Sequence, residues 1–321
     1  MVEIPAGRFL MGDRKDRVHF PQDGEGPVRP VRMSGFLMDR FEVSNAKFRA
    51  FAEATKYVTD AERLGDSFVA EVYLSEAVSA SIHRHVNVTP WWLPTPQASW
   101  RSPEGVDSSL EESKYGLRWD HPVVHMSWND ANAYCRWRNA SLPTEAQWEY
   151  AARGGLEQKL YPWGDTMYGN ETEDIEAKYR MNIWQGQFPT ENTAEDGYVK
   201  TAPVDAYGPQ NDWGLYNMVG NAWEWTSDWW SPVHFLTEET KETGLVDPIG
   251  PTEEELEELV DMGILKKDAS GAFEKTKRGG SFMCHHSYCY RYRVMARSHL
   301  TVDSSAHHLS MRCVRPKETA G

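Results

Sequence analysis

The sequence predicts a single α+β domain with modest regular secondary structure, spanning residues 1–321. Three observations support this prediction. Helical periodicity is confined to short runs, alternating apolar patterns are brief, and residues 156–215 carry glycine, proline and asparagine throughout without any periodicity. A chain of 321 residues is not too long for one domain. Its 14 tryptophans predict a core built largely from aromatic side chains.

The N-terminal part of the chain predicts two extended segments followed by a helix. Residues 7–12 favour a short strand that ends on glycine, and residues 27–36 show an alternating apolar pattern for part of their length. Ser44 and Asn45 then precede a helical run over residues 46–55. Its buried face is predicted from apolar side chains at helical spacing, namely Phe48, Phe51 and Ala52.

Two further helices are indicated by their capping residues. Residues 127–130 offer N-cap candidates before a helix over residues 131–138. Thr144 can cap the next helix, which is expected to end at Gly154 because glycine readily adopts the conformation that terminates a helix. The inward-facing side chains of the first of these helices are expected to be Tyr134 and Cys135.

Two later segments have distinct compositions. An irregular stretch as long as residues 156–215 is usually functional or held in place by something such as a metal. Residues 236–277 form an acidic insertion, in which Thr252 can cap a helix over residues 253–262. We expect that helix to lie on the surface, with one apolar stripe made of Leu256, Leu259 and Val260.

The charge and hydropathy of the chain exclude some classes of partner. The formal net charge is −14, and phosphate recognition needs a basic patch, so nucleic acid is not expected as a partner. No run of about 18 apolar residues is present, so no membrane span is expected. The chain starts without the basic and apolar regions of a signal peptide. The sequence leaves two compartments possible: the cytoplasm or, if a leader was removed, the endoplasmic reticulum lumen or the extracellular space. We expect a monomer.

The four cysteines divide into one close pair and two isolated residues. Cys284 and Cys289 are five positions apart, whereas Cys135 and Cys313 have no cysteine nearby in the sequence. Residues at this spacing point apart both in a straight strand and in a helix, so their sulfur atoms can meet only if the chain turns. The spacing alone leaves four interpretations open: a disulfide, a metal site, a redox relay or two unrelated buried thiols.

The neighbours of the close pair add to this picture. Arg291 and Arg293 follow it, together with histidines and hydroxyl side chains, and nearby cations favour the thiolate form. Two thiolates without a third soft ligand suit Cu(I) better than zinc, which takes four ligands. Residues 278–315 contain a single acid, Asp303, in an otherwise acidic protein, and this local composition indicates a candidate site.

The string GGSFMCHHSYCYRYR, residues 279–293, resembles the active-site signature of the formylglycine-generating enzymes. The resemblance covers nearly the whole chain. The wider superfamily is indicated by the tryptophan-rich blocks, whereas the two cysteines are specific, because catalytically silent relatives lack them. The further matching blocks are residues 41–45, 65–68, 90–94, 121–123, 127–131, 142–146, 182–186, 217–226, 296–298 and 303–305.

This resemblance implies a C-type-lectin-like fold and a copper-dependent oxidase. Members of the family use molecular oxygen to convert a cysteine in a Cys-x-Pro-x-Arg motif of an unfolded sulfatase chain to formylglycine. Carried over, Cys284 and Cys289 are expected to hold Cu(I). Three residues match the oxygen and substrate pocket and suit hydrogen bonding or the exclusion of water, namely Ser281, Tyr288 and Trp223. The alternative is a catalytically silent member that binds sulfatases or other proteins.

The resemblance also implies substrate-binding residues and two structural calcium sites. Glu42 and Asp66 match acids that receive the substrate arginine, and Ser67 is expected beside them. The alternative is that Glu42 caps a helix N-terminus and Asp66 is a turn residue. Oxygen ligands drawn from loops suit calcium, which would keep residues 156–215 ordered. The alternative to calcium is that Asn182 and Asn217 only hydrogen-bond the loop backbone. The first set is Asn182, Ile183, Asp196 and Tyr198, and the second is Asn217, Gly220, Ala222 and Glu224.

Some positions depart from the animal members of the family. Cys135 and Cys313 match a family disulfide, with two buried thiols as the alternative. A second disulfide of animal members is missing, since its positions hold Ala152 and Val294, and this loss resembles bacterial members. Neighbouring histidines on a strand face opposite ways, so we expect pocket walls or surface rather than metal ligands. These histidines are His285, His286, His307 and His308. His286 replaces an arginine of animal members, and His308 replaces an asparagine.

Overall fold

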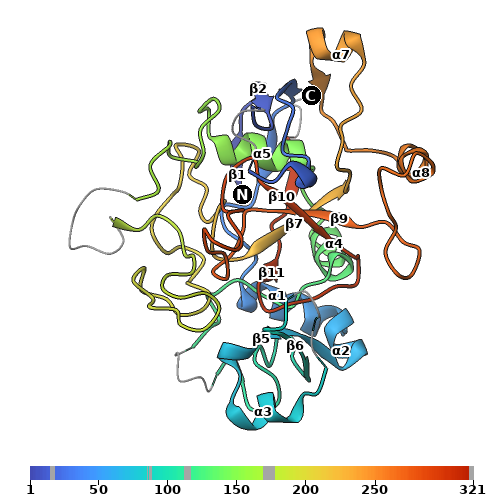
Figure 1. Ribbon diagram of the computed structural model, residues 1–321. Helices are drawn as coiled ribbons and strands as arrows, with labels where there is room; N and C mark the ends of the chain where they lie inside the picture. Colours follow the sequence, from blue (N-terminus) through green and yellow to red (C-terminus); the bar gives the residue numbers. More distant parts are fainter. Residues whose placement is uncertain (15–18, 85, 87–88, 112–116, 169–177, 318–321) are drawn as a thin grey trace.

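The computed structural model describes all residues except 15–18, 85, 87–88, 112–116, 169–177 and 318–321. Short helices surround small sheets, and long irregular loops connect them (Figure 1). The predicted α+β class with modest regular structure is confirmed. No helix in this part of the chain is long and apolar enough to cross a membrane.

The strands form four small sheets within the described residues. The largest has the order β10, β9, β7 and β11, in which only β11 runs parallel to its neighbour. Another joins the two ends of the chain, because β4 lies between β1 and β12. Sheet by sheet, the strands are β1 (Val2–Ile4), β4 (Phe36–Met38) and β12 (Val314–Pro316); β2 (Gly7–Met11), β3 (Arg29–Met33) and β8 (Leu245–Val246); β5 (Asp66–Ala70) and β6 (Trp92–Pro96); β10 (Arg297–Leu300), β9 (Lys275–Arg278), β7 (Trp223–Trp229) and β11 (Leu309–Ser310).

The longer helices begin at the predicted capping residues. The side chain of Ser127 accepts from the backbone N–H of Asp130 at the start of α4, and Thr144 caps α5 in the same way. Gly154 ends α5 at a φ of 54°, a left-handed conformation that glycine adopts without strain. The helices are α1 (Asn45–Thr55), α2 (Asp60–Leu64), α3 (Glu76–Ser81), α4 (Trp128–Trp137), α5 (Glu145–Arg153), α7 (Glu238–Thr243) and α8 (Glu253–Asp261), with 3₁₀ turns at Pro21–Asp23 and Glu71–Tyr73.

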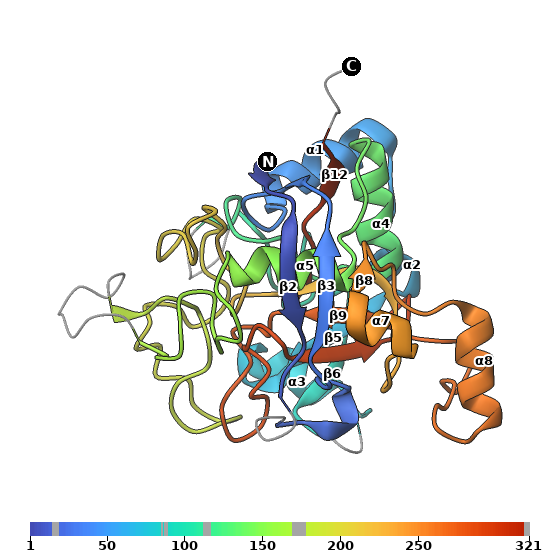
Figure 2. The same cartoon turned by 90° about the horizontal axis from the view of Figure 1, so that it is seen from above.

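The acidic insertion is partly integrated into the fold. Its helix α8 projects from one side of the molecule, as both views in Figures 1 and 2 show, with Leu256 and Leu259 buried as predicted. The strand β8 of the same insertion pairs in parallel with β3, which the sequence did not predict. On the opposite side lie the irregular loops of residues 156–168 and 178–215, in which no strand is described (Figure 2).

The core is aromatic, as the tryptophan content predicts. Its completely buried indoles include Trp100, Trp148, Trp184 and Trp225. The predicted disulfide between Cys135 and Cys313 is present, with the two Cα atoms 5.6 Å apart, and it fastens α4 to the C-terminal segment. At the positions of the missing second disulfide, Ala152 and Val294 are completely buried in the main core, where they pack as apolar side chains.

Buried ion pairs explain much of the basic composition of the C-terminal segment. The arginines pair with acids far away in the sequence. Their density therefore does not by itself indicate a site, and the inference drawn from the composition of residues 278–315 needs this correction. The pairs are Arg278 with Glu145 and Glu149, Arg291 with Asp23, Arg293 with Glu25, Arg297 with Glu145, and Arg312 with Glu224. These contacts fasten the signature segment to α5 and to the N-terminal third of the chain.

One buried carboxylate predicts a specific acid sensitivity. Glu104 receives two hydrogen bonds from Arg118, at 2.7 and 2.9 Å, and an ion pair from Lys200 at 2.7 Å. Burial alone would raise the pKa of Glu104, but these partners lower it from 4.5 to about 2. A carboxylate whose pKa is lower in the folded state than in the unfolded state stabilises the fold. For Glu104 this stabilisation is fully present above the unfolded-state pKa and is lost as the pH falls from about 4.5 to about 2.

We expect Glu104→Gln to reduce the free energy of unfolding at pH 7 by on the order of 3 kcal/mol. The loss should shrink as the pH falls towards 2, because the wild-type carboxylate is then protonated as well. Denaturant unfolding at a series of pH values measures it. An equal loss at pH 7 and at pH 2.5 would contradict the assignment.

Candidate active site

A cavity of about 370 Å³ is bounded by β7, β9 and β10, by β5 and β6, and by loops of the C-terminal segment. Its walls include Lys277 and Arg291, whereas no Asp or Glu of the described residues lines it. Such surroundings favour a thiolate and offer no hard carboxylate ligand for a divalent cation. The cavity contains every residue predicted as catalytic: Trp223, Ser281, Cys284, Tyr288 and Cys289.

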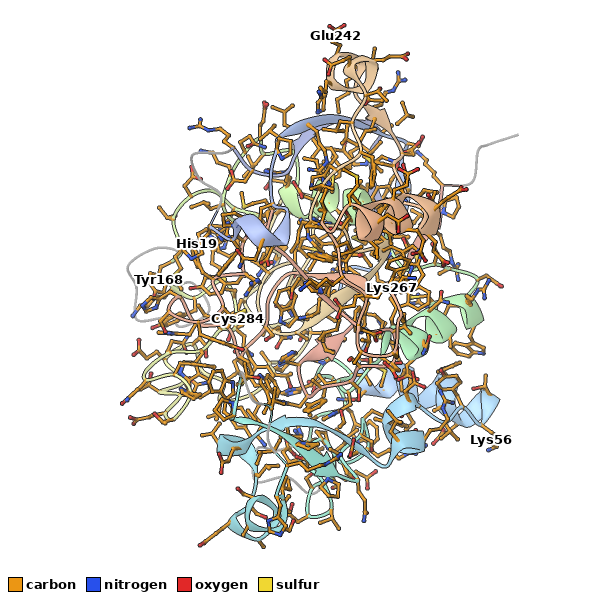
Figure 3. The ribbon with its side chains drawn as sticks, turned by 45° about the vertical axis from the view of Figure 1, so that its right-hand side comes forward. His19, Lys56, Tyr168, Glu242, Lys267 and Cys284 are labelled. Carbon is orange, nitrogen blue, oxygen red and sulfur yellow. A yellow bond between two sulfur atoms is a disulfide. The ribbon has the colours of Figure 1, made fainter. Side chains whose placement is uncertain are left out.

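The cysteine pair lies in the loop that follows β9, where Figure 3 labels Cys284. The backbone N–H of Cys289 donates to the carbonyl of His285 at 2.7 Å, and that of Cys284 donates to the carbonyl of Ser281 at 2.9 Å. This turn brings the Cα atoms of the two cysteines to 4.7 Å and joins their sulfurs as a disulfide. The turn that the spacing required is therefore confirmed.

The glycine pair before the loop allows a close approach of two chain segments. A Cβ on Gly279 would lie 2.8 Å from the carbonyl oxygen of Met218, and the φ of this residue is 95°. The N–H of Gly220 donates to the carbonyl of Gly279, and the N–H of Phe282 donates to that of Asn221. The signature loop is thus fastened directly to residues 217–221, where one calcium set was predicted.

The other predicted catalytic side chains occupy different parts of the cavity. Tyr288 lies at its mouth, 37% exposed, stacked on Phe188 with ring centroids 4.6 Å apart. Ser281 is completely buried, and its hydroxyl accepts from the N–H of Met283. Trp223 forms a buried wall on β7. The cavity therefore combines buried inner walls with a partly exposed phenol.

A buried lysine in this cavity was not predicted from the sequence. The ammonium nitrogen of Lys277 lies 4.1 Å from the centroid of the Trp223 ring. Burial, with a smaller contribution from the charge of Arg291, lowers the pKa of Lys277 to about 7. A signal was present, because Lys277 lies two positions before the signature, but nothing in the sequence indicated that the whole of β9 is buried.

The predicted substrate-binding residues do not lie together. Asp66 is partly exposed and forms an ion pair with Arg84 at 2.9 Å, beside Phe68, which lines the cavity. Ser67 points away into the interior, where its hydroxyl bonds two neighbours, and it does not line the cavity. Glu42 is completely buried. A substrate arginine cannot reach Glu42 without opening the core, so the expectation for Glu42 needs correction.

Glu42 instead lies against the second predicted calcium set, of which it was not a predicted member. Its two carboxylate oxygens accept from the side-chain amides of Asn217 and Asn221, each at 2.9 Å. Burial raises the pKa of Glu42, since the attraction of Arg312 does not fully compensate the loss of water. The side-chain oxygen of Asn217 is buried without a partner, while Glu224 is already paired with Arg312. An unpartnered oxygen beside an uncompensated carboxylate suits a cation.

The first predicted calcium set is also brought together. The carboxylate of Asp196 accepts from the backbone N–H groups of Ile183 and Tyr198, at 3.0 and 3.1 Å. Burial raises the pKa of Asp196 to about 6. The side-chain oxygen of Asn182 is buried and unpartnered, as is that of the neighbouring Gln185. These orphaned oxygens are consistent with a cation between the loops.

The histidines lie where a wall or surface role predicts. His308 lines the cavity, and burial lowers its pKa well below the usual value. His307 is buried behind it against aromatic rings, while His286 is exposed on the loop. In the described residues no group of three or more His, Cys, Asp or Glu side chains is arranged to hold a metal.

Several curated proteins are similar to this chain over nearly its whole length. The chain is 51% identical over 313 residues to the formylglycine-generating enzyme of Mus musculus, covering 98% of this chain and 74% of that protein. The corresponding protein of Thermomonospora curvata is 49% identical, with 98% and 92% covered. A Mus musculus protein named inactive C-alpha-formylglycine-generating enzyme 2 is 40% identical over 99% of this chain and 87% of its own length.

The fold and the family are thereby established. PvdO of Pseudomonas aeruginosa has the same fold at a TM-score of 0.63 and 20% identity, with 98% of this chain and 93% of that one covered. The family model of the sulfatase-modifying factor enzyme 1-like domain matches residues 1–317. With that match and the identity to its relatives, the chain belongs to the formylglycine-generating enzyme family of sulfatase-modifying factors.

Proposed function

We propose that this protein is a copper-dependent oxidase that converts a cysteine in a Cys-x-Pro-x-Arg motif of an unfolded sulfatase to formylglycine. The observation that carries the proposal is the pair Cys284 and Cys289 on the wall of an acid-free cavity that also holds Ser281, Tyr288 and Trp223. A buried disulfide alone would not need an open cavity with cationic walls. The names of the similar enzymes support the same conversion.

Cys284 and Cys289, once reduced, are the residues that would hold Cu(I). Two adjacent thiolates form a soft donor set, and no carboxylate of the described residues lines the cavity to oppose their deprotonated form. The metal, when bound, supplies the affinity for the substrate thiolate and for oxygen that no side chain here provides. The remaining task of the chain is to bind the peptide, exclude water and supply protons.

The chemistry balances with a thiol reductant. The thiol-bearing methylene group of the substrate cysteine becomes an aldehyde, with one molecule of oxygen consumed and one each of hydrogen sulfide and water released. This balance requires two further electrons and two protons from external thiols. Lys277 is placed to exchange protons with the cavity, because its pKa of about 7 lets it hold or give up a proton near neutrality. Trp223 keeps that part of the cavity dry.

The substrate arginine is assigned to Asp66. This carboxylate already binds a guanidinium, that of Arg84, whose side chain is 76% exposed. An exposed pair of this kind contributes little stability, so an incoming arginine can displace Arg84 at small cost. The strand β5 then leads from Asp66 to Phe68 in the cavity wall.

The test is mass spectrometry of a Cys-Ala-Pro-Ala-Arg peptide incubated with reduced protein, Cu(I), oxygen and a thiol. We expect the mass change that accompanies conversion of the thiol to the aldehyde, and a lower rate when the arginine of the peptide is replaced by alanine. An unchanged peptide with copper bound would indicate a different substrate. An unchanged peptide without bound copper would favour the alternative, a silent member that only binds its partner.

Calcium is assigned to the two loop sites. Asn182 and Asp196, with the backbones of Ile183 and Tyr198, would hold one ion. Asn217, the backbones of Gly220 and Ala222, and Glu224 would hold the other, with Glu42 as a further carboxylate. The ions would neutralise buried carboxylates and fix the loops, without taking part in the chemistry.

We expect calcium added to chelator-treated protein to raise the melting temperature by about 3–8 °C. The increase should fall in Asp196→Asn and in Glu42→Gln, because each loses a ligand charge. Asp212→Asn, an exposed acid in the same irregular region, is the matched control and should keep the full increase. An equal increase with magnesium, or one untouched by both ligand variants, would contradict these sites.

A further inference from the structure

A row of hydrogen-bonded side chains runs from the interior to the cavity wall. His125 Nε2 lies 2.8 Å from the carbonyl oxygen of Pro103, and its Nδ1 lies 2.7 Å from Ser67 Oγ. Ser67 Oγ in turn lies 2.7 Å from Ser305 Oγ. His125 and Ser67 are almost completely buried, whereas Ser305 lines the cavity. The row therefore has a fixed inner end and an outer end at the substrate pocket.

Hydrogen-bond chemistry gives this row a single direction. A carbonyl oxygen only accepts, so His125 Nε2 must carry a proton. Burial lowers the pKa of His125 to about 4, so the ring is neutral near pH 7 and its Nδ1 can only accept. Ser67 therefore donates its proton to His125, and Ser305 must donate its own proton to Ser67. With that proton used, the Ser305 hydroxyl can offer only lone pairs to the cavity.

The surrounding structure holds this direction in place. The charged groups that face His125 are Glu104 and Arg118, and they are bonded to each other. The ring of His307 lies 6.4 Å away and is uncharged for the same reason of burial. His125 has a φ of 61°, a conformation that residues other than glycine adopt at a cost. Its N–H donates to the carbonyl of Ala306, the neighbour of Ser305.

We propose that Ser305 is a hydrogen-bond acceptor for a backbone N–H of the bound substrate peptide, and that His125 positions it through Ser67. The proposal rests on the proposed function, since it takes the substrate to be a peptide that enters this cavity. A peptide that leaves water must find acceptors for its N–H groups, and each one left without a partner weakens binding. The cavity walls supply cationic donors from Lys277 and Arg291, but no carboxylate of the described residues.

Neighbouring hydroxyl and ring groups are less suited to this role. Ser304 also lines the cavity, but its partner is the Thr301 hydroxyl, 2.6 Å away, which donates in turn to the exposed Asp303 rather than to a buried histidine. His299 Nδ1 is bonded to Glu274. Among the described residues, no group besides Ser67 is hydrogen-bonded to the Ser305 hydroxyl. Ser305 thus combines a free acceptor face with a buried support that fixes its orientation.

The test replaces single amides of the peptide by esters, which removes one N–H at a time. The probe is a blocked, fluorescently labelled Cys-Ala-Pro-Ala-Arg peptide, and its binding to reduced, copper-free protein is measured without oxygen by anisotropy. We expect one ester position to weaken binding to the wild type by roughly threefold to tenfold. In Ser305→Ala the same ester should cause no further weakening, because the acceptor is absent.

Two more variants separate a positioning role from a general structural one. In Ser67→Ala that ester should weaken peptide binding less than it does in the wild type. Ser305 then loses its fixed proton acceptor, and its hydroxyl can rotate. Ser304→Ala is the matched control, a serine of the same cavity outside the row, and should leave the penalty as in the wild type. Melting temperatures are measured for each variant to check that it is folded.

The outcomes are distinct from a failure of the proposed oxidase. An ester penalty of equal size in wild type and Ser305→Ala, or no ester penalty at any position, overturns the assignment. A parent peptide that does not bind at all overturns it as well. Binding with the expected coupling, but without conversion once copper and oxygen are supplied, would support the acceptor and contradict the oxidase instead.

Discussion

Replacing Cys284 or Cys289 by serine is expected to reduce formylglycine production by at least about 10³-fold. A serine hydroxyl is a hard donor with a high pKa and does not hold Cu(I), so the substrate thiolate loses the metal that it needs. Binding of the peptide to the copper-free protein should change little, because the other cavity walls remain in place. Conversion is measured by mass spectrometry under saturating peptide, and copper binding by titration of the same variants.

The other cysteine pair is the control for this prediction. Cys135 and Cys313 form a disulfide outside the cavity lining, and both are completely buried. A double replacement by alanine should reduce stability by about 2–5 kcal/mol while conversion at low temperature is retained. Conversion near the wild-type rate in Cys284→Ser would contradict the copper assignment, and so would normal copper binding by that variant.

Local signals in the sequence predicted the longer helices well. Their caps and apolar spacing act within one or two turns, so α1, α4, α5 and α8 were found close to their bounds. The short elements α2, β5, α3 and β6 were not predicted. Helices of five or six residues carry too little periodicity, and β5 and β6 are held by pairing with each other across distant positions.

The candidate site was predicted where the residues are close in sequence and only partly elsewhere. The signature loop places both cysteines, Ser281 and Tyr288 in one cavity, as expected. Glu42 illustrates the limit, because only the fold reveals that residues about 175 positions apart bury its carboxylate against Asn217. Ser67 is similar, since its hydroxyl faces His125 rather than the substrate. Long-range contacts of this kind leave no local pattern in the sequence.

The buried ion pairs show the same dependence on distant partners. Arg312 donates to both oxygens of Glu224, at 2.6 and 2.7 Å, and to the carbonyl of Tyr216. Both partners of this ion pair are completely buried. Glu42 lies close enough for its carboxylate to interact with both of them. One guanidinium therefore pairs with Glu224, interacts electrostatically with Glu42, and holds the C-terminal segment against the loop that carries the second predicted calcium set.

Arg312→Met is expected to destabilise the protein by about 3–5 kcal/mol, because it leaves Glu224 buried without its cation. Unfolding in denaturant measures the loss. Adding Glu224→Gln to that variant should recover part of it, since the unpaired charge is then removed. Arg49→Met, the same substitution in the exposed pair with Glu53, is the matched control and should leave the unfolding midpoint unchanged. If the double variant loses as much unfolding free energy as the two single variants lose together, the charge pair itself does not hold these two segments together.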